Sequence, residues 1–574
     1  MIEGDAQRPP DYAGIGTPSG CEDKMRDIVF LCLLLLLLAA TNLSAQNEPE
    51  WQWAAQAGGT GSEAGSAIAT GINGNSYAAG CFYGTSCFGT TQLNSSGNSD
   101  IFVAKLDQNG NWVWAIQAGG ASFDEAKCIA VDSSENIYIS GYFSETASFG
   151  STSLGSDGGR EVFVAKADSD GNWLWAVSAG GTGNERGLGI AVDSTGGIYL
   201  TGFFEDTAYF GPLLLTSSGG NDIFVAKLDG EGDWLWALNA GGSGSDVGRA
   251  VSVFGNACLY ITGSFTETVL FGNTTLTSSG GKDVFVGKLD TNGNWIWAKK
   301  AGGTSDDSAH GIAGDNAANV YLTGRFIGVI HFGDISLSSS GFEDCFIAKL
   351  DSDGNWQWAV RAGGPGQDFG ELVAVDNAAN VYLTGYFENT ASFGSAWFAS
   401  IGYVDIFVAK LDSDGNWQWA VQAGGTNYDF GKGIAVDGSA HIHLTGSFLG
   451  TAGFGTISLG TNGASDIFVA KLSPGGVWLS DAITPEIPGL SRLDGVYPNP
   501  LRKGDPAFVK THVSDLEGGT LKLFDIRGQL LLSRSLQPGT QQTSLDTRRL
   551  SPGVYLYQLT TPTAQMVKKL ILVN

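Results

Sequence analysis

The chain has 574 residues, 85 of them glycine, and its 31 basic and 58 acidic side chains give a formal net charge of −27. This acid excess argues against binding to nucleic acid or to an anionic membrane surface. The hydrophobic share of 43%, with 16 Trp and 31 Phe, is too high for a disordered acidic chain. The glycine content leaves two alternatives open, low complexity and collagen, and the period of the glycines decides between them.

The N-terminal segment has the pattern of a secretory signal. Residues 28–40 form an apolar run that is shorter than the roughly 20 residues of a membrane span. The small residues that signal peptidase requires follow this run and end at Ala45. We expect Met25 to be the natural start, so that residues 1–45 comprise a non-native leader and a cleaved signal peptide. The mature chain is then predicted to have no transmembrane span.

A period of 61 residues follows the signal peptide. Each repeat contains four short apolar segments separated by polar or glycine-containing turns, and none has a helical period. Turns this short require antiparallel neighbours. We therefore predict a seven-bladed β-propeller of 61-residue repeats over residues 46–478, in which an FG-containing stretch between the second and third strands forms an extra hairpin. The Trp-x-Trp pairs of the repeats begin at Trp51, Trp112, Trp173, Trp234, Trp295, Trp356 and Trp417.

The two ends of the array are complementary. It begins with a fourth strand and ends with a third strand, so pairing of Trp51–Ala54 with Ile467–Leu472 completes the last blade. Such pairing removes an exposed sheet edge. A degenerate copy of the fourth strand, VWLS at 477–480, is an alternative partner for the same edge. We predict closure by the first pairing.

The repeated segments also carry a family resemblance. Their pattern of GIAVD, YLTG, DIFVAKLD and DGNW over residues 51–478 resembles the SBBP-type β-propeller repeat of secreted bacterial proteins. The resemblance implies the fold. It hardly constrains the function, because that family as a whole has no single known activity.

The composition changes after the array. Residues 479–493 are rich in Pro, Gly and Ser and are predicted to be a linker. Residues 494–574 contain short alternating segments, including a hairpin around Arg527 and Gly528, and predict a small Ig-like β-sandwich.

This last segment resembles the type A C-terminal sorting domain of the type IX secretion system. The residues that match its motifs are Tyr497, Pro498, Asn499, Pro500, Gly553, Tyr555, Lys568 and Lys569. The resemblance implies recognition by the type IX machinery, export across the outer membrane, and a secreted or cell-surface destination.

Two acidic positions recur in every repeat and are candidate ligand-binding sites. The first follows the AGG turn, where the loops of a propeller crowd the mouth of the channel: Glu63, Asp124, Glu185, Asp246, Asp307, Asp368 and Asp429. A ring of seven carboxylates there is able to bind cations, including calcium, or a basic ligand. The alternative is that each acid accepts backbone N–H groups of its own loop. The second position has the same two interpretations: Asp100, Glu161, Asp222, Asp283, Asp344, Asp405 and Asp466.

Other candidate sites have simpler structural interpretations. The turns that begin at Asp351 and Asp412 resemble calcium loops, but they lack the glycine and glutamate spacing of an EF-hand. The Trp pairs are either sugar-stacking platforms or packing residues, and packing is favoured because every repeat has them. Trp397 lies outside the repeat register and is a better candidate for a ligand contact. His441 and His443 share one strand face, without a recognisable third metal ligand.

The cysteines do not indicate a zinc or redox site. The sequence contains no CxxC pair. Cys81 and Cys87 are close enough to bridge a local turn, and free thiols are the alternative.

No catalytic set of residues is recognisable, because the repeats are nearly interchangeable. We expect an exported binding, adhesion or structural protein with a glycan or protein ligand, without enzymatic activity and without a cofactor. One alternative is a multivalent lectin with one weak site in each blade. Another is a secreted glycan-directed enzyme that uses the blade-specific residues Lys299, Lys300, Arg325, Arg361 and His310.

Overall fold

The computed structural model describes two units, Met1–Trp478 and Leu479–Asn574, each considered separately below. The described residues are 49–475 without 256, then 492–497, 501–502, 507–513 and 519–573 without 526, 528, 538, 546–547, 549, 552 and 562–564. The predicted signal peptide and most of the predicted linker lie outside the described residues. Every secondary-structure element of the described residues is a β-strand.

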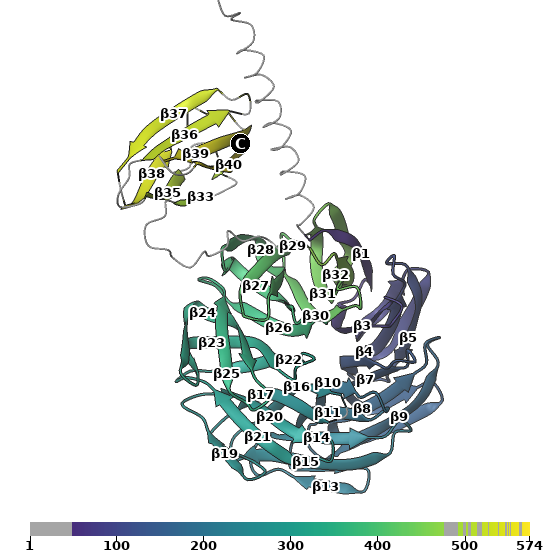
Figure 1. Cartoon of the computed structure of the whole chain (residues 1–574). Helices are drawn as coiled ribbons and strands as arrows, with labels where there is room; N and C mark the ends of the chain where they lie inside the picture. Colours follow the sequence, from purple (N-terminus) through teal and green to yellow (C-terminus); the bar gives the residue numbers. More distant parts are fainter. Residues whose placement is uncertain are drawn as a thin grey trace, which may run out of the picture. The chain divides into compact units, whose positions relative to one another are not determined.

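Each of the seven sheets has four main antiparallel strands, the last of them completed by the first strand of the chain, and the innermost strands face a common centre (Figure 1). The innermost strands are β2 (Ala64–Thr70), β6 (Glu125–Val131), β10 (Arg186–Val192), β16 (Val247–Phe254), β22 (Ser308–Gly314), β26 (Asp368–Val375) and β30 (Asp429–Val436). The second strands are β3 (Ser76–Phe88), β7 (Ile137–Phe149), β11 (Ile198–Phe204), β17 (Cys258–Phe265), β23 (Val320–Phe332), β27 (Val381–Phe393) and β31 (Ile442–Phe454). The third strands are β4 (Thr91–Leu106), β8 (Thr152–Ala167), β14 (Asp222–Leu228), β20 (Asp283–Asp290), β24 (Ile335–Leu350), β28 (Ala396–Leu411) and β32 (Ile457–Leu472). The outer strands are β5 (Trp112–Ala118), β9 (Trp173–Gly181), β15 (Trp234–Gly242), β21 (Trp295–Ala301), β25 (Trp356–Ala362), β29 (Trp417–Gly425) and, beside β32, β1 (Trp51–Gly59).

The FG-containing stretch forms the predicted extra hairpin. In most repeats the second and third strands continue past a bulge to form its two arms. In the third and fourth repeats the arms are separate strands: β12 (Thr207–Phe210), β13 (Leu213–Thr216), β18 (Thr268–Phe271) and β19 (Thr274–Thr277). Each hairpin pairs with the glycine-rich end of the outer strand of the preceding sheet, as Ala452 does with Gly425. Main-chain pairing therefore links successive sheets.

The first strand of the chain completes the last sheet. β1 pairs antiparallel with β32, from Trp51 opposite Leu472 to Ala57 opposite Ile467, and this confirms the predicted pairing. Each innermost strand contacts that of the next repeat, and β2 contacts β30.

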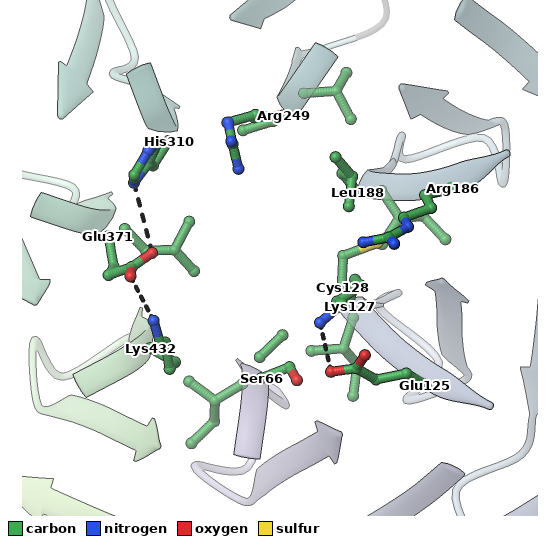
Figure 2. Close-up of a pocket in the computed structure, with 18 of the residues that line it drawn as sticks. Ser66, Glu125, Lys127, Cys128, Arg186, Leu188, Arg249, His310, Glu371 and Lys432 are labelled. Atoms are coloured by element: carbon green, nitrogen blue, oxygen red, sulfur yellow. Dashed lines mark hydrogen bonds and ion pairs between the residues drawn. The ribbon is translucent and has the colours of Figure 1, made fainter. Parts of the chain in front are cut away.

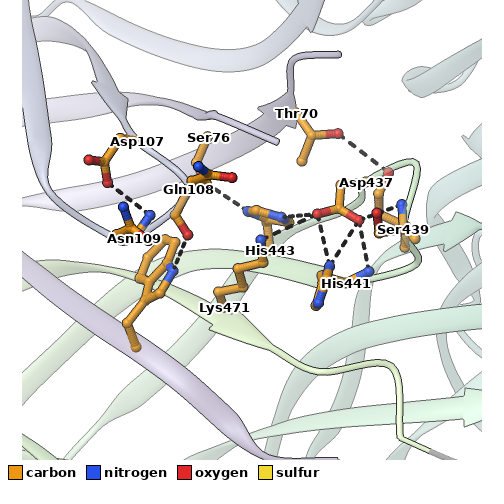
Figure 3. A network of polar contacts seen from close by, with 12 residues as sticks. Thr70, Ser76, Asp107, Gln108, Asn109, Asp437, Ser439, His441, His443 and Lys471 are labelled. Carbon is orange, nitrogen blue, oxygen red and sulfur yellow. Dashed lines mark hydrogen bonds and ion pairs between the residues drawn. The ribbon is translucent and has the colours of Figure 1, made fainter. Parts of the chain in front are cut away.

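A polar network stabilises the same joint between the first and last repeats (Figure 3). The Oγ atom of Ser76 lies 2.7 Å from Nδ1 of His443, whose side chain is buried. Asp437 holds His443 and His441, since its Oδ2 atom lies 3.2 Å from a ring nitrogen of each. Lys471 adds a third contact, with its Nζ atom 3.4 Å from the same oxygen. The two histidines thus serve as partners of one carboxylate within the last repeat, and His443 links this network to the first repeat through Ser76.

The tryptophan pairs pack between elements, as the favoured interpretation predicts. The first indole meets the phenylalanine of the extra hairpin edge-on, as Trp112 meets Phe88 at 5.3 Å between ring centres. The second indole reaches the next repeat, where Nε1 of Trp358 donates to the Ser413 carbonyl oxygen at 3.1 Å. Both contacts recur around the array.

The C-terminal unit contains two sheets. A three-stranded sheet has the order β33 (Arg492–Tyr497), β35 (Ala507–Val513), β38 (Gly539–Leu545). A five-stranded sheet has the order β34 (Leu501–Arg502), β40 (Gln565–Val573), β39 (Gly553–Thr560), β36 (Gly519–Asp525), β37 (Leu530–Leu536). The pair β36 and β37 is the predicted hairpin around Arg527 and Gly528.

The sorting-motif residues are spread over this unit. Tyr497 ends β33, Gly553 begins β39, and Lys568 and Lys569 lie in β40. Tyr555 is buried in the core beside leucines of the larger sheet. Pro498, Asn499 and Pro500 lie outside the described residues.

Candidate ligand-binding cavity

The seven acids that follow the AGG turns are loop anchors in the structure. Each is at most 1% exposed, so the expected open ring of carboxylates at the channel mouth does not form. Each accepts a hydrogen bond of 2.7–3.3 Å from the N–H of the second glycine of its own turn. The physical reason is that the glycine-rich turn leaves backbone donors that need a buried acceptor.

The second set of acids is buried against the first. A Cβ atom on Gly119 would meet the carboxylates of both Asp100 and Asp124, and similar pairs recur in other repeats. In the second set, one carboxylate oxygen accepts a nearby backbone N–H, as Asp100 does from Ser96 at 3.1 Å. Several of these acids have a buried carboxylate oxygen without a hydrogen-bond partner among the described residues: Asp100, Asp222, Asp283, Asp344, Asp405 and Asp466.

Burial changes the titration of these acids. It raises the pKa of Glu63, Glu185, Asp246, Asp307, Asp368 and Asp429 to about 7, and that of Asp124 to about 6. The neighbouring acid of the second set adds to the rise, as Asp100 does for the pKa of Asp124. When folding raises the pKa of a carboxyl, the group contributes its full stabilisation only at pH values below its pKa in the unfolded chain. This stabilisation is lost as the pH rises to the pKa that the group has in the folded protein.

The variant Asp100→Asn tests this burial. Burial raises the pKa of Asp100 from 3.8 to about 6, so we expect the contribution of this group to the free energy of unfolding of the parent to fall between about pH 4 and pH 6. The amide removes the charge and supplies a donor for the neighbouring acid. We expect the variant to be more stable than the parent by about 1 kcal/mol at pH 8, with a shallower pH dependence in urea unfolding. The exposed Asp334→Asn is the control, and an unchanged slope in Asp100→Asn would contradict the account.

A cavity of about 570 Å³ lies between the innermost strands. Every innermost strand contributes residues to its lining. Seven of these residues, one from each strand, are spaced 61 apart in the sequence and are named the cavity ring here: Ser66, Lys127, Leu188, Arg249, His310, Glu371 and Lys432. Each sits at a register shift in its strand, between two paired residues, and is therefore the extra residue of a β-bulge. Bulges redirect a side chain and are common beside binding sites.

The cavity ring varies in chemistry from one repeat to the next. The two residues that flank each ring residue are almost all Gly or Ala, which leaves room for a long side chain. The seven ring residues include three bases, one acid and one histidine. The cavity is thus an asymmetric feature of a largely repetitive domain.

Part of the cavity charge is neutralised internally (Figure 2). Nζ of Lys432 lies 2.5 Å from Oε1 of Glu371, and Nδ1 of His310 lies 3.6 Å from its Oε2. Lys127 pairs with Glu125 on the same strand. Burial tends to raise the pKa of Glu371, yet Lys432 and His310 outweigh burial and hold that pKa well below its ordinary value. Glu371 is therefore an ionised partner of these two bases.

Two arginines of the cavity have no such partner. Arg186 and Arg249 form no ion pair among the described residues, and the Nε atom of each is buried without a hydrogen-bond partner. Both side chains point into the cavity, on either side of Leu188 (Figure 2). Burial lowers the pKa of Arg249, and the negative charge of Glu371 offsets only part of this effect. The guanidinium of Arg186 lies over the rings of Tyr142 and Phe203, 4.9 Å and 5.8 Å from their centres. A guanidinium without an ion pair still favours an incoming anion, preferably a carboxylate that accepts two hydrogen bonds.

Sequence reasoning named some cavity residues and missed others. Among the blade-specific candidates, His310 lines the cavity and Arg325 lies next to Phe369. Lys300 and Arg361 instead pair with the buried acids Asp283 and Asp344 on the outer side of their sheets. Apart from His310, the cavity ring was not among the predicted site residues. When the seven repeats are aligned with one another, the cavity ring can be recognised as a position whose charge changes from repeat to repeat.

The remaining candidates have plain structural roles. The carboxylate of Asp351 accepts the backbone N–H groups of Asp353 and Asn355 within a hairpin turn. In the part of the chain that the structure describes, Cys81 is a buried free thiol and Cys87 an exposed one. No three His, Cys, Asp or Glu side chains gather around a common point in the described ranges. A helix able to cross a membrane is likewise absent from the described residues.

The C-terminal unit identifies the destination of the protein. Residues 495–573 match the secretion system C-terminal sorting domain family. This sorting domain indicates export to the cell surface or beyond by the type IX secretion system. The described part of the exported chain is an all-β repeat domain followed by this sorting domain.

Known proteins resemble the chain in its repeats. An uncharacterized WD repeat-containing protein, L264, of Acanthamoeba polyphaga mimivirus is 24% identical over 521 residues, which cover 71% of this chain and 37% of that protein. The regulatory protein FlaEY of Caulobacter vibrioides is 28% identical over 344 residues, 55% of this chain and 35% of that protein. The chain thus spans little more than a third of these curated relatives. A solved fungal alcohol oxidase of the AA5 family aligns with 92% of this chain and 100% of its own at a TM-score of 0.37 and 12% identity.

Proposed function

We propose that the repeat domain is a closed seven-bladed β-propeller of the SBBP type. Three observations support this: the unbroken 61-residue period, the pairing of β1 with β32, and the contact between the innermost strands β2 and β30. The WD-repeat relative is consistent with the same architecture.

We propose further that the exported propeller is a binding protein whose ligand is an anion held in the central cavity, and that it has no enzymatic activity. The observation that carries this proposal is the cavity ring together with the unpaired Arg186 and Arg249. A chain with a net charge of −27 repels anions in general. Two unpaired arginines inside such a chain therefore indicate selection for a negatively charged ligand rather than a general surface property.

Calorimetry with citrate tests the binding proposal. We expect the mature chain to bind citrate at low salt, and both Arg249→Gln and Arg186→Gln to weaken binding at least about tenfold, since each removes charge-assisted hydrogen bonds. Lys282→Gln, at an exposed position, removes the same charge and should leave the affinity unchanged. No binding, or equal losses in all three variants, would overturn the proposal.

A further inference from the structure

A strip of apolar side chains is exposed on the sixth repeat. Trp397, Ile401 and Tyr403 alternate along the outward face of β28 and are 59%, 65% and 63% exposed. In the other repeats the corresponding positions are mostly Ser, Thr, Asn or Gly. This strip is thus specific to one repeat, as a ligand contact would be.

The strip continues as a track of aromatic rings toward the cavity. Tyr403 and Tyr428 stack at 4.9 Å with an angle of 11° between their planes. Tyr428 lies 6.3 Å from Phe430, and Phe430 meets Tyr386 edge-on at 4.9 Å. Tyr386 in turn stacks on Phe369 at 4.7 Å. The exposed fraction falls along the track, from 63% at Tyr403 and 45% at Tyr428 to 9% at Phe369.

The track ends beside the charged residues of the cavity. Nζ of Lys432 lies 4.8 Å from the ring centre of Tyr386 and 5.5 Å from that of Phe430. Lys432 is itself a member of the cavity ring and pairs with Glu371. An elongated ligand on the aromatic track would therefore reach the basic groups of the cavity.

We propose that the ligand is an acidic oligosaccharide that runs along the aromatic track, with one of its carboxylates at Arg249 and Arg186. This inference rests on the proposed function and names the chemical class of its ligand. A pyranose ring presents an apolar C–H face that packs on an aromatic ring, and its hydroxyl and carboxylate groups suit the polar residues beside the track. The repetition of aromatic rings outside a cationic cavity matches a chain of repeated anionic sugars.

An extended peptide fits this track less well. Peptides commonly bind by pairing with the free edge of a strand. Here the backbone N–H groups of Tyr403 and Val404 already donate to the Asn427 carbonyl oxygen, at 3.1 Å and 3.3 Å. The track therefore offers side-chain faces and few main-chain partners at its centre.

Calorimetry with galacturonic acid and its hexamer tests the proposal on the mature chain. We expect the hexamer to bind more tightly than the monomer. The double variant Tyr403→Ala/Tyr428→Ala should weaken the affinity for the hexamer about tenfold and leave the affinity for the monomer unchanged. The variant Tyr428→Phe keeps the aromatic ring and should retain hexamer binding. Both tyrosines are exposed, so these variants should fold; circular dichroism and the citrate affinity of each variant check this.

The outcomes separate the two proposals. Hexamer binding that does not depend on Tyr403 and Tyr428 would overturn the proposal that the ligand binds along the aromatic track. Hexaglutamate is the peptide probe. If it binds at least as tightly as the galacturonic acid hexamer and its binding depends on the same tyrosines, the ligand is an acidic peptide and the oligosaccharide proposal is overturned. Citrate binding without hexamer binding would overturn the oligosaccharide and leave the proposed function in place. Loss of both would overturn the proposed function as well.

Discussion

Gly425→Val is expected to destabilise the repeat domain by about 3 kcal/mol or to prevent folding, because a side chain at this position overlaps the main chain of the next repeat. A Cβ atom on Gly425 would lie well inside van der Waals contact of the Thr451 carbonyl oxygen. The neighbouring Ala452 is the strand partner of Gly425, so neither segment can retreat without breaking the pairing between two sheets. Urea unfolding of the purified variant measures the effect.

Gly155→Val is the matched control for this change. Gly155 also lies in a strand, β8, but it is exposed, and a Cβ there meets no atom within 4 Å. Valine favours strands, so the control should be neutral or slightly stabilising. Equal unfolding midpoints for the two variants would contradict the steric account of the AGG turns. The second glycine occupies the same environment in the other repeats, at Gly59, Gly120, Gly181, Gly242, Gly303 and Gly364.

Deletion of residues 49–59, which removes β1, is expected to cost at least about 5 kcal/mol, since the last sheet loses two packed indoles and its outer strand. Trp51 packs against Phe454, and Trp53 against His443. The deletion also exposes the edge of β32, which promotes aggregation. Size-exclusion chromatography and urea unfolding of the truncated chain measure both effects.

A relocated strand is the control for the deletion. When residues 51–59 are moved to follow Leu472 through a DSDGN turn, the last repeat has the same strand order as the others. We expect this variant to recover most of the lost stability. A truncated chain as stable as the parent would show that another segment, such as residues 477–480, completes the sheet, and closure by β1 would then be wrong.

The strands could be predicted from the sequence because their signals are local. Alternation of apolar residues, turn residues such as Gly415 with its positive φ of 84°, and an unbroken period fix the strands and their order. The pairing of β1 with β32 also followed from the sequence, since the array begins and ends with complementary strands.

The candidate site depended on information that is not local. The bulge at Arg249 depends on how its strand pairs with the next, which no single segment reveals. The stacking of Tyr403 on Tyr428 joins different repeats, so no spacing rule predicts it. The burial of Asp124 could not be decided from sequence either, because a loop acid and a channel-mouth acid have the same local pattern. In each case the tertiary arrangement decided between alternatives that the sequence left open.

Titration calorimetry measures how many citrate molecules bind to each mature chain. This stoichiometry tests most directly whether the variable cavity ring, rather than the repeated positions, binds the ligand. A single asymmetric cavity predicts one citrate per chain, lost together with the charge of Arg249. A stoichiometry near seven would assign binding to a site present in every repeat, and the absence of binding would remove the cavity as an anion site. Either of these results would contradict the account.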